Sequence, residues 1–479
     1  MRILAYTLLL LSCRKQLCEG LQFPGSHPIR PQIDQEEAQH PSRDDAGQLN
    51  RRSFISGISS GLLISGSATA ATVDSSITPR KDYYWPYWGA LPVFPFAYRR
   101  TLKRQVASKV WTFDQLIGIY YVQTPIRMTV IAMESGGLLV YAPVALTPEC
   151  RRLLQPIMDE YGPIRYIILP TVAVEHKVLA GPFARAFPQA EFYTTDQQYS
   201  FPLNLPDRTL GLPSWSKPLP KSSDGTNLWN GEFEHEVLTV KPGIGSMYQD
   251  VAMVHKPSGT LLVCDALFAT TENPPDIFTE IPEYTTALLF HARDSPSEIV
   301  PDTLENRQKG WRRIVLLFNF FFPNYSAKAD LGVGPLLKLD PSYPLGWAGW
   351  MPFEWIAPND KDIRAFERYS ANGKPTIYTI VQIILSRGDS GKATLEWVDR
   401  VKQWKFDKVI PAHLDAPLAI GPKEFSETYD FIRKGQNRVR YCDEDVAFLR
   451  AAEEGPLKFS VYPSNLGVLR GDPCTTTTN

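Results

Sequence analysis

The stretch LPTVAVEHKVLAG, residues 169–181, follows a buried-type apolar run and carries an informative charged pair. The run YIIL ends at Pro170, and Glu175 and His176 follow shortly after it. A loop that carries a carboxylate and an imidazole directly after a β-strand is typical of a metal site in an α/β protein. Most of the ligands of a complete site are absent from this stretch. It therefore predicts part of a metal site.

Patterned segments before this stretch predict strands and a helix in a defined order. Two apolar runs around the Gly-rich turn ESGG, residues 134–137, predict a β-hairpin. Residues 147–162, TPECRRLLQPIMDEYG, have helical spacing of apolar residues between a threonine N-cap and a glycine stop. The buried strand IRYIILP, residues 164–170, comes next. Glu175 and His176 are then expected in the loop after this strand.

Two later blocks also end a strand at a residue type that binds metals. In residues 231–268, three strands joined by a Pro-Gly turn and a Lys-Pro-Ser-Gly turn lead to Asp265. In residues 397–418, a short amphipathic helix and the strand KVIP precede His413. Open-faced sheets expose their sites at the carboxyl ends of buried strands. We therefore expect Asp265 and His413 to belong to the same site as the first stretch.

The three blocks resemble the metallo-β-lactamase fold, an αββα sandwich. The site loops of that fold carry a T-H-x-H-x-D-H motif, a P-G-H turn, a G-D strand end and a late G-H. With the first motif placed on residues 170–176, Thr171 and Ala173 stand where its first two histidines should be. Ile244 stands for the histidine of the turn, and Cys264 stands for the glycine before the strand-end aspartate.

These substitutions remove one half of a two-metal site and keep the other half. In two-metal members of the fold, the three missing histidines hold one ion. The resemblance implies that the second half is kept by Glu175, His176, Asp265 and His413. Two imidazoles and two carboxylates suit one divalent ion, with Zn, Fe and Mn all compatible with the ligand types. A metal-free relic stays open as the alternative, because Glu175 is one methylene longer than the aspartate of the motif.

Two stretches resemble a narrower family more closely. They are LPTVAVEHKVLAGPFARAFPQAEFY, residues 169–193, and WKFDKVIPAHLDAPL, residues 404–418. The family comprises plant, algal and cyanobacterial proteins, typically plastid-associated, that are known only as a domain of unknown function. The resemblance runs from Trp111 to Arg433. It implies the fold and the positions of the site but no reaction.

Residues 1–70 are expected to be a targeting presequence. The apolar run in MRILAYTLLLLSC is too short to span a bilayer and is typical of a secretory signal. Arg51 and Arg52 precede a weakly apolar run and an A-x-A site ending at Ala70, which resembles a twin-arginine export signal. A chance arginine pair before a linker is the alternative. Stacked signals of this kind resemble presequences of algal thylakoid-lumen proteins, so we expect a plastid location, in the thylakoid lumen.

The rest of the chain is expected to form one metallo-β-lactamase-like α/β domain with a large insertion before its last site strand. Hydrophobic residues make up 43% of the chain and the net charge is −1, which gives no electrostatic reason to expect nucleic acid as a partner. The expected division is an irregular aromatic and Pro-rich segment over 71–110, the first part of the domain over 111–268, the insertion over 269–390, the last part over 391–440, and a C-terminal helix with a disordered tail over 441–479.

The expected insertion contains GWRRIVLLFNFFFPNY, residues 310–325, where paired arginines adjoin an apolar-aromatic run. This run predicts a lid over the site or a surface that dips into a membrane leaflet. A core helix of the insertion is the competing interpretation. The run is too short to span a membrane.

The remaining cysteines and histidines are expected to lie outside the site. Cys442 and Cys474 either pair in an oxidising compartment or remain thiols. His235 alternates with carboxylates along a strand and His255 lies at a turn, so both are expected to face water, with a place at the rim of the site as the alternative for His235.

Two functions follow from these observations. The first is a single-metal hydrolase or metal-dependent oxidoreductase that acts on an unknown small molecule. Loss of the second ion disfavours ordinary two-metal hydrolysis. The second is a non-catalytic scaffold whose insertion binds a photosynthetic complex, pigment or lipid, with peripheral membrane contact and no transmembrane span in the processed chain.

Overall fold

The computed structural model describes residues 80–85, 98–198, 206–223, 228–243, 247–356, 360–434, 438–458 and 470–474. The expected presequence, residues 1–70, lies outside these ranges, and so does Ile244.

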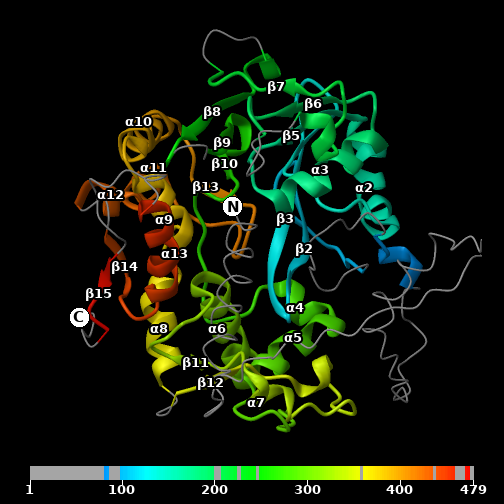
Figure 1. Ribbon diagram of the computed structural model, residues 1–479. Coiled ribbons are helices and arrows are strands. Elements are labelled where there is room, and N and C mark those ends of the chain that lie inside the picture. The colour runs from blue at the N-terminus through cyan, green and yellow to red at the C-terminus, as the bar shows by residue number, and fades with distance from the viewer. Residues whose placement is uncertain are drawn as a thin grey trace, which may run out of the picture.

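Two β-sheets form the centre of the molecule (Figure 1). The larger sheet has the strand order β1-β2-β3-β4-β5-β6-β7, and the smaller has the order β13-β10-β9-β8. The strands of the larger sheet are β1 (Leu102–Ala107), β2 (Val110–Ile119), β3 (Val122–Ala132), β4 (Leu138–Tyr141), β5 (Ile164–Leu169), β6 (Glu191–Thr194) and β7 (Lys217–Pro218). Those of the smaller are β8 (Phe233–Val240), β9 (Tyr248–His255), β10 (Thr260–Val263) and β13 (Lys408–Pro411). The strands from β1 to β4 pair antiparallel, those from β4 to β7 pair parallel, and β10 pairs parallel with β13.

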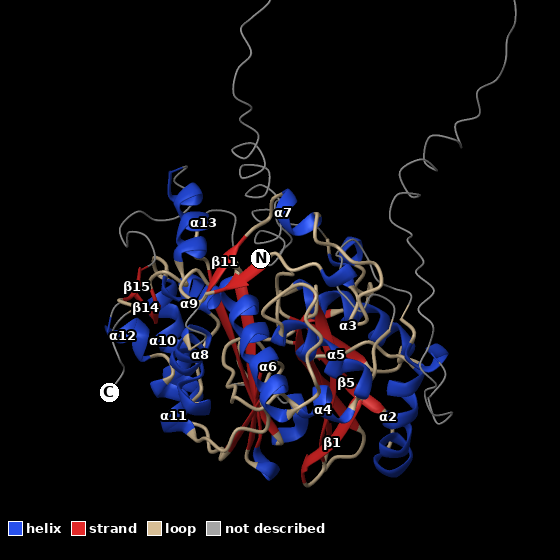
Figure 2. Ribbon diagram, turned by 90° about the horizontal axis from the view of Figure 1, so that it is seen from below, coloured by secondary structure: helices blue, strands red, loops and turns tan. Residues whose placement is uncertain are grey.

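Helices cover the outer faces of both sheets (Figures 1 and 2). Helices α2 (Pro148–Tyr161) and α3 (Val174–Ala186) share a hydrophobic core with the larger sheet. Helices α9 (Thr379–Ser386), α10 (Ser390–Val401) and α11 (Pro422–Glu427) share another with the smaller sheet. A third core lies between the two sheets. The predicted αββα sandwich is therefore confirmed.

Strand alternation explains how each strand serves two cores. In β10, Leu261 and Val263 face the helices, whereas Leu262 and the following Cys264 belong to the core between the sheets. All four side chains are fully buried. Burial on both faces explains why the strand is a continuous apolar run without polar alternation. The same alternation directs Cys264 inward, toward the larger sheet.

The structure confirms the predicted hairpin and helix before the site. Strands β3 and β4 pair antiparallel around the ESGG turn. The hydroxyl of Thr147 accepts a 3.1 Å hydrogen bond from the backbone N–H of Cys150 and caps α2. Gly162 ends the helix at φ 97°, a conformation that a side chain disfavours.

Two local predictions were wrong. Residues 71–110 were expected to be irregular, but they include β1, which pairs with β2 at the edge of the larger sheet. Glu175 and His176 were expected in a loop, but they lie in the first turn of α3. Gly181 and Pro182 argue against a helix there, yet Gly181 packs so closely on the carbonyl of Gly211 that an added Cβ would lie 2.1 Å from that oxygen. This tertiary contact requires a glycine within the helix.

The stretch expected to be an insertion, residues 269–390, is largely helical. Besides α9 it contains α4 (Asp276–Glu280), α5 (Pro282–Ala292), α6 (Leu304–Phe320), β11 (Ala327–Ala329), α7 (Val333–Leu336), β12 (Phe353–Trp355) and α8 (Lys361–Ser370).

Short 3-10 helices elsewhere in the described chain and in this stretch are η1 (Arg80–Tyr83), η2 (Asp207–Leu210), η3 (Leu228–Gly231), η4 (Lys256–Ser258), η5 (Trp347–Gly349) and η6 (Ala371–Gly373).

The apolar-aromatic run of residues 310–325 forms most of α6 and is a core helix. Trp311, Ile314 and Leu316 are fully buried in the same core as the smaller sheet. The structure thus supports the core-helix interpretation of this run over a lid or a membrane-dipping surface. Among the described residues, no helix combines the length and apolar character that crossing a bilayer requires.

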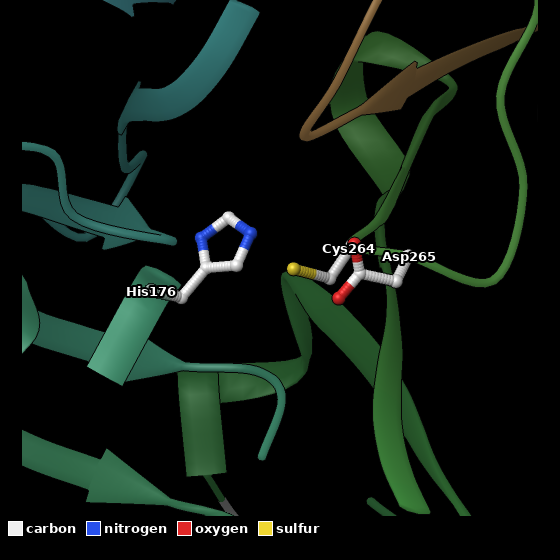
Figure 3. Close-up of side chains that lie close together, drawn as sticks. All are labelled: His176, Cys264 and Asp265. Atoms are coloured by element: carbon white, nitrogen blue, oxygen red, sulfur yellow. The ribbon is translucent and has the colours of Figure 1, made fainter. Parts of the chain in front are cut away.

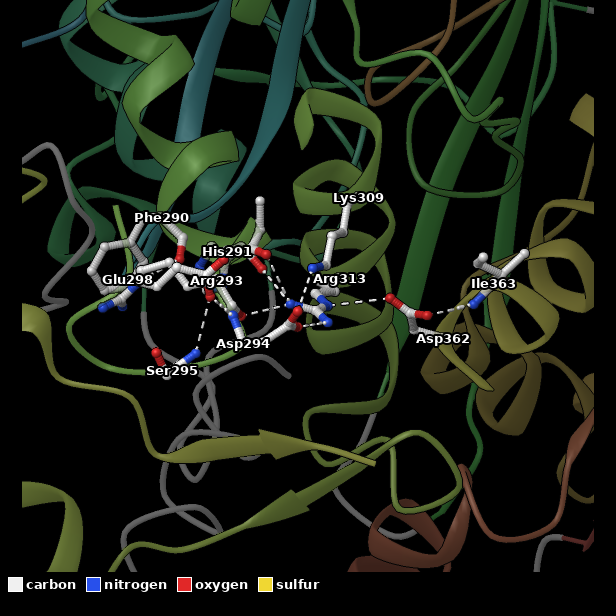
Figure 4. A network of polar contacts seen from close by, with 11 residues as sticks. Phe290, His291, Arg293, Asp294, Ser295, Glu298, Lys309, Arg313, Asp362 and Ile363 are labelled. Carbon is white, nitrogen blue, oxygen red and sulfur yellow. Dashed lines mark hydrogen bonds and ion pairs between the residues drawn. The ribbon is translucent and has the colours of Figure 1, made fainter. Parts of the chain in front are cut away.

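One buried arginine joins three helices of this region (Figure 4). Arg313 on α6 donates to the carbonyls of residues 291–293 at 2.7 to 3.3 Å and so satisfies the C-terminal end of α5. It also donates to Asp294 at 2.6 Å and to Asp362 of α8 at 3.2 Å. The guanidinium lies 4.5 Å from the ring centre of Trp355. The second of the paired arginines is therefore a structural element of the core.

The C-terminal part of the chain is more ordered than predicted. Strand β14 (Arg438–Cys442) pairs with β15 (Arg470–Asp472), and α13 (Ala447–Lys458) lies between them in sequence. Cys442 and Cys474 form a disulfide, which decides between the two states left open for them. The disordered tail expected within residues 441–479 is thus wrong for residues 470–474, which the structure describes. Helix α12 (Asp430–Lys434) precedes β14.

Candidate metal centre

The predicted site residues lie where strands of the two sheets end. His176 and Glu175 begin α3, which follows β5 of the larger sheet. Asp265 and His413 follow β10 and β13, neighbouring parallel strands of the smaller sheet whose last residues pair in register. Because parallel neighbours end at the same edge, these two residues are brought side by side.

A backbone carbonyl on the side of the ring away from the site fixes the orientation of His413. Its Nδ1 lies 2.7 Å from the backbone carbonyl oxygen of Pro125. A carbonyl only accepts, so Nδ1 carries a proton and donates it. In the neutral ring the lone pair is then on Nε2, which faces the site. A carbonyl partner of this kind is typical of the histidines that bind metals in proteins.

Two ligand atoms converge on Nε2 of this ring. Nε2 of His413 lies 3.1 Å from Nε2 of His176 and 3.2 Å from Oδ1 of Asp265. The side chains of both histidines are 0% exposed, and Asp265 is 4% exposed. A lone pair that faces a carboxylate in a buried place is unfavourable unless a cation or proton lies between the two.

The potential ligands form two groups that share Asp265. One group is Glu175, Asp265 and His413, and the other is His176, Cys264 and Asp265, each with one ligand atom per residue and all atoms within 4.8 Å of one another. Figure 3 shows the second group, with the sulfur of Cys264 directed toward the imidazole of His176. The structure therefore brings the four predicted residues into one cluster and adds Cys264 to it. Glu175 as a whole residue is half-buried, but the carboxylate that it offers to the cluster is buried.

Asp250 on β9 anchors the loop that carries two of these residues. Its carboxylate accepts the backbone N–H of Cys264 at 3.2 Å and that of Asp265 at 2.6 Å. The hydroxyl of Tyr248 donates to it at 3.0 Å. Complete burial, followed by the charge of Asp265, raises the pKa of Asp250 to about 8. One carboxylate thus presents Cys264 and Asp265 to the site together.

Arg127 on β3 anchors the loop that carries His413. Its guanidinium donates at 2.8 Å to the carbonyls of Pro411 and Leu414, and its backbone N–H donates to Ala412 at 2.8 Å. The same guanidinium forms a bidentate salt bridge with Asp114, the residue directly opposite on β2, at 2.7 and 2.8 Å. The loop of one sheet is therefore fastened to the other sheet around the histidine.

Thr171 is the residue that the motif resemblance places at the first missing histidine. Its hydroxyl lies 3.4 Å from Oδ2 of Asp265, and its backbone forms an isolated bridge with Asp250. A threonine here supplies a hydrogen bond to the kept aspartate in place of a metal ligand. Ala173, at the second position, has no group that can ligate.

Cys264, Asp250, Arg127 and Asp114 were not predicted to matter, although the sequence carries a signal for each. Asp250, Arg127 and Asp114 are charged residues inside otherwise apolar strands, and such residues need a buried partner. Cys264 precedes a strand-end aspartate, and the alternation along the strand directs its side chain into the core between the sheets. Periodicity alone does not say which partner each residue has.

Two histidines expected to face water are buried. His235 lies 3.2 Å from the indole nitrogen of Trp229 and 2.9 Å from the carbonyl of Pro220. His255 lies 3.2 Å from a carboxylate oxygen of Glu232. Residues that precede β8 cover the end of the β8–β9 hairpin where both histidines lie. The alternation of polar residues along the strand therefore did not mean that these side chains are exposed. Both histidines lie outside the two ligand groups.

Comparisons with known proteins place the chain in a family. Residues 107–431, more than half of the chain, match the family model described as Domain of unknown function (DUF4336). None of the curated proteins matches the chain.

Solved structures similar to the chain include a metal-soaked Flv1 flavodiiron core from Synechocystis sp. PCC6803, with 10% identity, TM-score 0.37 and 79% of this chain aligned to 73% of that one. They also include a putative diflavin flavoprotein fragment from Nostoc sp. PCC 7120, with 10% identity, TM-score 0.35, and 71% and 98% coverage. A metallo-β-lactamase from Hirschia baltica has 10% identity, TM-score 0.33, and 69% and 97% coverage. Likenesses this distant say nothing about which metal or substrate this chain takes.

Proposed function

Because the chain belongs to the family described as Domain of unknown function (DUF4336), whose description names no reaction, we propose a function from the geometry of its site. The chain binds one divalent metal ion through Glu175, His176, Asp265 and His413. The observation that carries this proposal is the convergence of three buried ligand atoms, with Nε2 of His413 lying 3.1 Å from Nε2 of His176 and 3.2 Å from Oδ1 of Asp265. A metal cation among these atoms can bond to all three. A proton shared between two of them is the alternative, and measuring the metal content separates the two cases.

The ligand types support a single-metal enzyme, a hydrolase or a metal-dependent oxidoreductase. When bound, the ion polarises a substrate oxygen or acidifies a bound water. The chain's own residues hold the ligands: Pro125 fixes the ring of His413, and Thr171 donates to Asp265. Thr171 and Ala173 give no ligands for a second ion, so the proposal does not include two-metal hydrolysis.

The test is elemental analysis of the full chain, purified without a histidine tag or chelator. We expect about one transition-metal ion per chain, as for other centres with four protein ligands. The His176→Ala/His413→Ala variant is expected to retain none. His235→Ala is the matched control, because it removes an equally buried histidine outside the site and is expected to keep the ion. A parent chain that remains metal-free after incubation with Zn, Fe and Mn contradicts the proposal.

A second candidate function is contact with a lipid surface through the region of residues 269–390. Val333, Leu336, Leu337 and Leu339 are 68%, 51%, 83% and 42% exposed, in and just after α7. The exposed Lys338 lies among them. Exposed leucines around a lysine suit the boundary between acyl chains and headgroups. This candidate is compatible with a metal-binding core that performs no catalysis.

Flotation with lipid vesicles tests this second candidate. We expect the full chain to float with phosphatidylcholine vesicles containing phosphatidylglycerol. Leu336→Ser/Leu337→Ser is expected to weaken binding by about tenfold per leucine, since each buried leucine contributes about 1.5 kcal/mol or more. Ile299→Ser/Leu304→Ser removes two residues of similar exposure, 63% and 64%, elsewhere in the region and is the control. Equal binding of both variants, or no flotation of the parent, excludes this surface.

The lumenal location remains a proposal. The Cys442–Cys474 disulfide supports an oxidising compartment. Fractionation of source cells into stroma, membranes and lumen tests it, and recovery of the protein in the stroma contradicts it.

A further inference from the structure

We propose that Cys264 is a ligand of the bound metal, so that the centre contains one thiolate. This inference rests on the proposed metal site and adds the chemical class of the ion, one that accepts sulfur. The juxtaposition of His176, Cys264 and Asp265, with ligand atoms within 4.8 Å of one another, carries it. Bonds from a zinc-class ion, about 2.3 Å to sulfur and about 2.0 Å to nitrogen, place tetrahedral ligand atoms about 3.5 Å apart, so these side chains need to close by about 1.3 Å at most to bind one ion.

The backbone of Cys264 is held in position by the same anchor as that of Asp265. The carboxylate of Asp250 accepts the N–H groups of both residues, so one anchor fixes both side chains at the end of β10. The inward phase of the strand places Cys264 in the core between the sheets, on the side from which His176 approaches (Figure 3). Cys264 is fully buried and is outside the disulfide.

Cys150 shows what a structural cysteine of this chain is like. It is equally buried, but it packs among the aliphatic residues between α2 and the larger sheet. Burial raises the pKa of its thiol to about 12, which keeps it protonated and unsuited to metal binding. It also lies outside both groups of potential ligands. The two buried cysteines therefore differ in their neighbours, and Cys150 is a matched control.

A thiolate ligand narrows the choice of metal. Sulfur favours Zn²⁺ and iron, whereas Mn²⁺ prefers carboxylate and water oxygens. Binding releases the thiol proton, because the thiolate is the species that ligates. Of the three metals compatible with the imidazoles and carboxylates, Mn²⁺ becomes the least suited.

The experiment is Co²⁺ reconstitution of the full-length chain carrying Cys13→Ser and Cys18→Ser, which removes the two cysteines outside the described residues. Retained Co²⁺ gives visible d–d bands, and a thiolate ligand adds a sulfur-to-cobalt charge-transfer band in the near ultraviolet. We expect both bands in this background and in Cys150→Ser. In Cys264→Ser we expect the d–d bands without the charge-transfer band.

The outcomes separate this inference from the function on which it rests. No retained Co²⁺ in the background chain overturns both. Retained Co²⁺ without a charge-transfer band, or with one that persists in Cys264→Ser, overturns the thiolate ligand and leaves the metal site standing. If Cys264→Ser does not fold, X-ray absorption of the zinc-loaded background chain decides: a sulfur neighbour at about 2.3 Å supports the inference, and its absence contradicts it.

Discussion

Replacing Arg313 with methionine is expected to lower the free energy of unfolding by about 3 to 5 kcal/mol. The change leaves the carbonyls of residues 291–293 without their donor and the buried carboxylate of Asp362 without its cation. It also removes the cation from the face of Trp355. Methionine keeps most of the volume, so the loss reports the polar contacts rather than a cavity. Urea denaturation followed by circular dichroism measures it.

Lys309→Ala is the control for this prediction. Lys309 pairs with the same Asp294 at 2.6 Å, but its side chain is partly exposed. Partly exposed pairs contribute little, so we expect a change below about 1 kcal/mol. Equal effects of the two substitutions would show that the buried network does not hold α5, α6 and α8 together.

Arg127→Met is expected to destabilise the protein by a similar amount, about 3 to 5 kcal/mol, and to weaken metal binding by about 10- to 100-fold. The substitution leaves the carboxylate of Asp114 without its two-pronged partner. It also releases the carbonyls of Pro411 and Leu414 on either side of His413. The histidine then loses its fixed position even in molecules that remain folded. Competition with a chelator, at a temperature where the variant is folded, measures the affinity.

Two further variants make this prediction specific. Arg127→Lys keeps the charge but not the planar fork, so we expect an intermediate loss of metal affinity. Arg165→Met removes an arginine at the surface of the same sheet, where its side chain bonds to the carbonyl of Gly136 at 3.1 Å. We expect it to change the free energy of unfolding by less than about 0.5 kcal/mol. A metal affinity of Arg127→Met equal to that of the parent would show that this anchor does not position His413.

The fold was predictable where local signals agree with the packing. The N-cap Thr147, the stop at Gly162 and the apolar runs before Asp265 and His413 each specify an element by themselves. Strand β1 was missed because LKRQVA is polar, which an edge strand with a single neighbour tolerates. The start of α3 was missed because Gly181 and Pro182 disfavour a helix, and only the contact with Gly211 explains the glycine.

The sequence predicted the residues that form the site but not how they are held. Strand-end positions and the fold resemblance together indicated Glu175, His176, Asp265 and His413. Asp250 binds a backbone group 15 positions away in the sequence, and Arg127 binds one 284 positions away. Hydrophobic periodicity does not predict which loops such distant residues contact. On the sequence alone, Cys264 is only a substitute for a motif glycine. Its sulfur comes close to His176 only because α3 lies next to the end of β10, and the sequence does not show this contact.

Anomalous X-ray diffraction from crystals of the full chain tests most directly whether this cluster binds a metal. Data collected on both sides of the absorption edge of the metal found by elemental analysis locate the ion. The account predicts one strong anomalous peak within bonding distance of Asp265 and His413, absent in the His176→Ala/His413→Ala variant. No peak there, or a peak only at surface residues, would contradict a metal centre at this site.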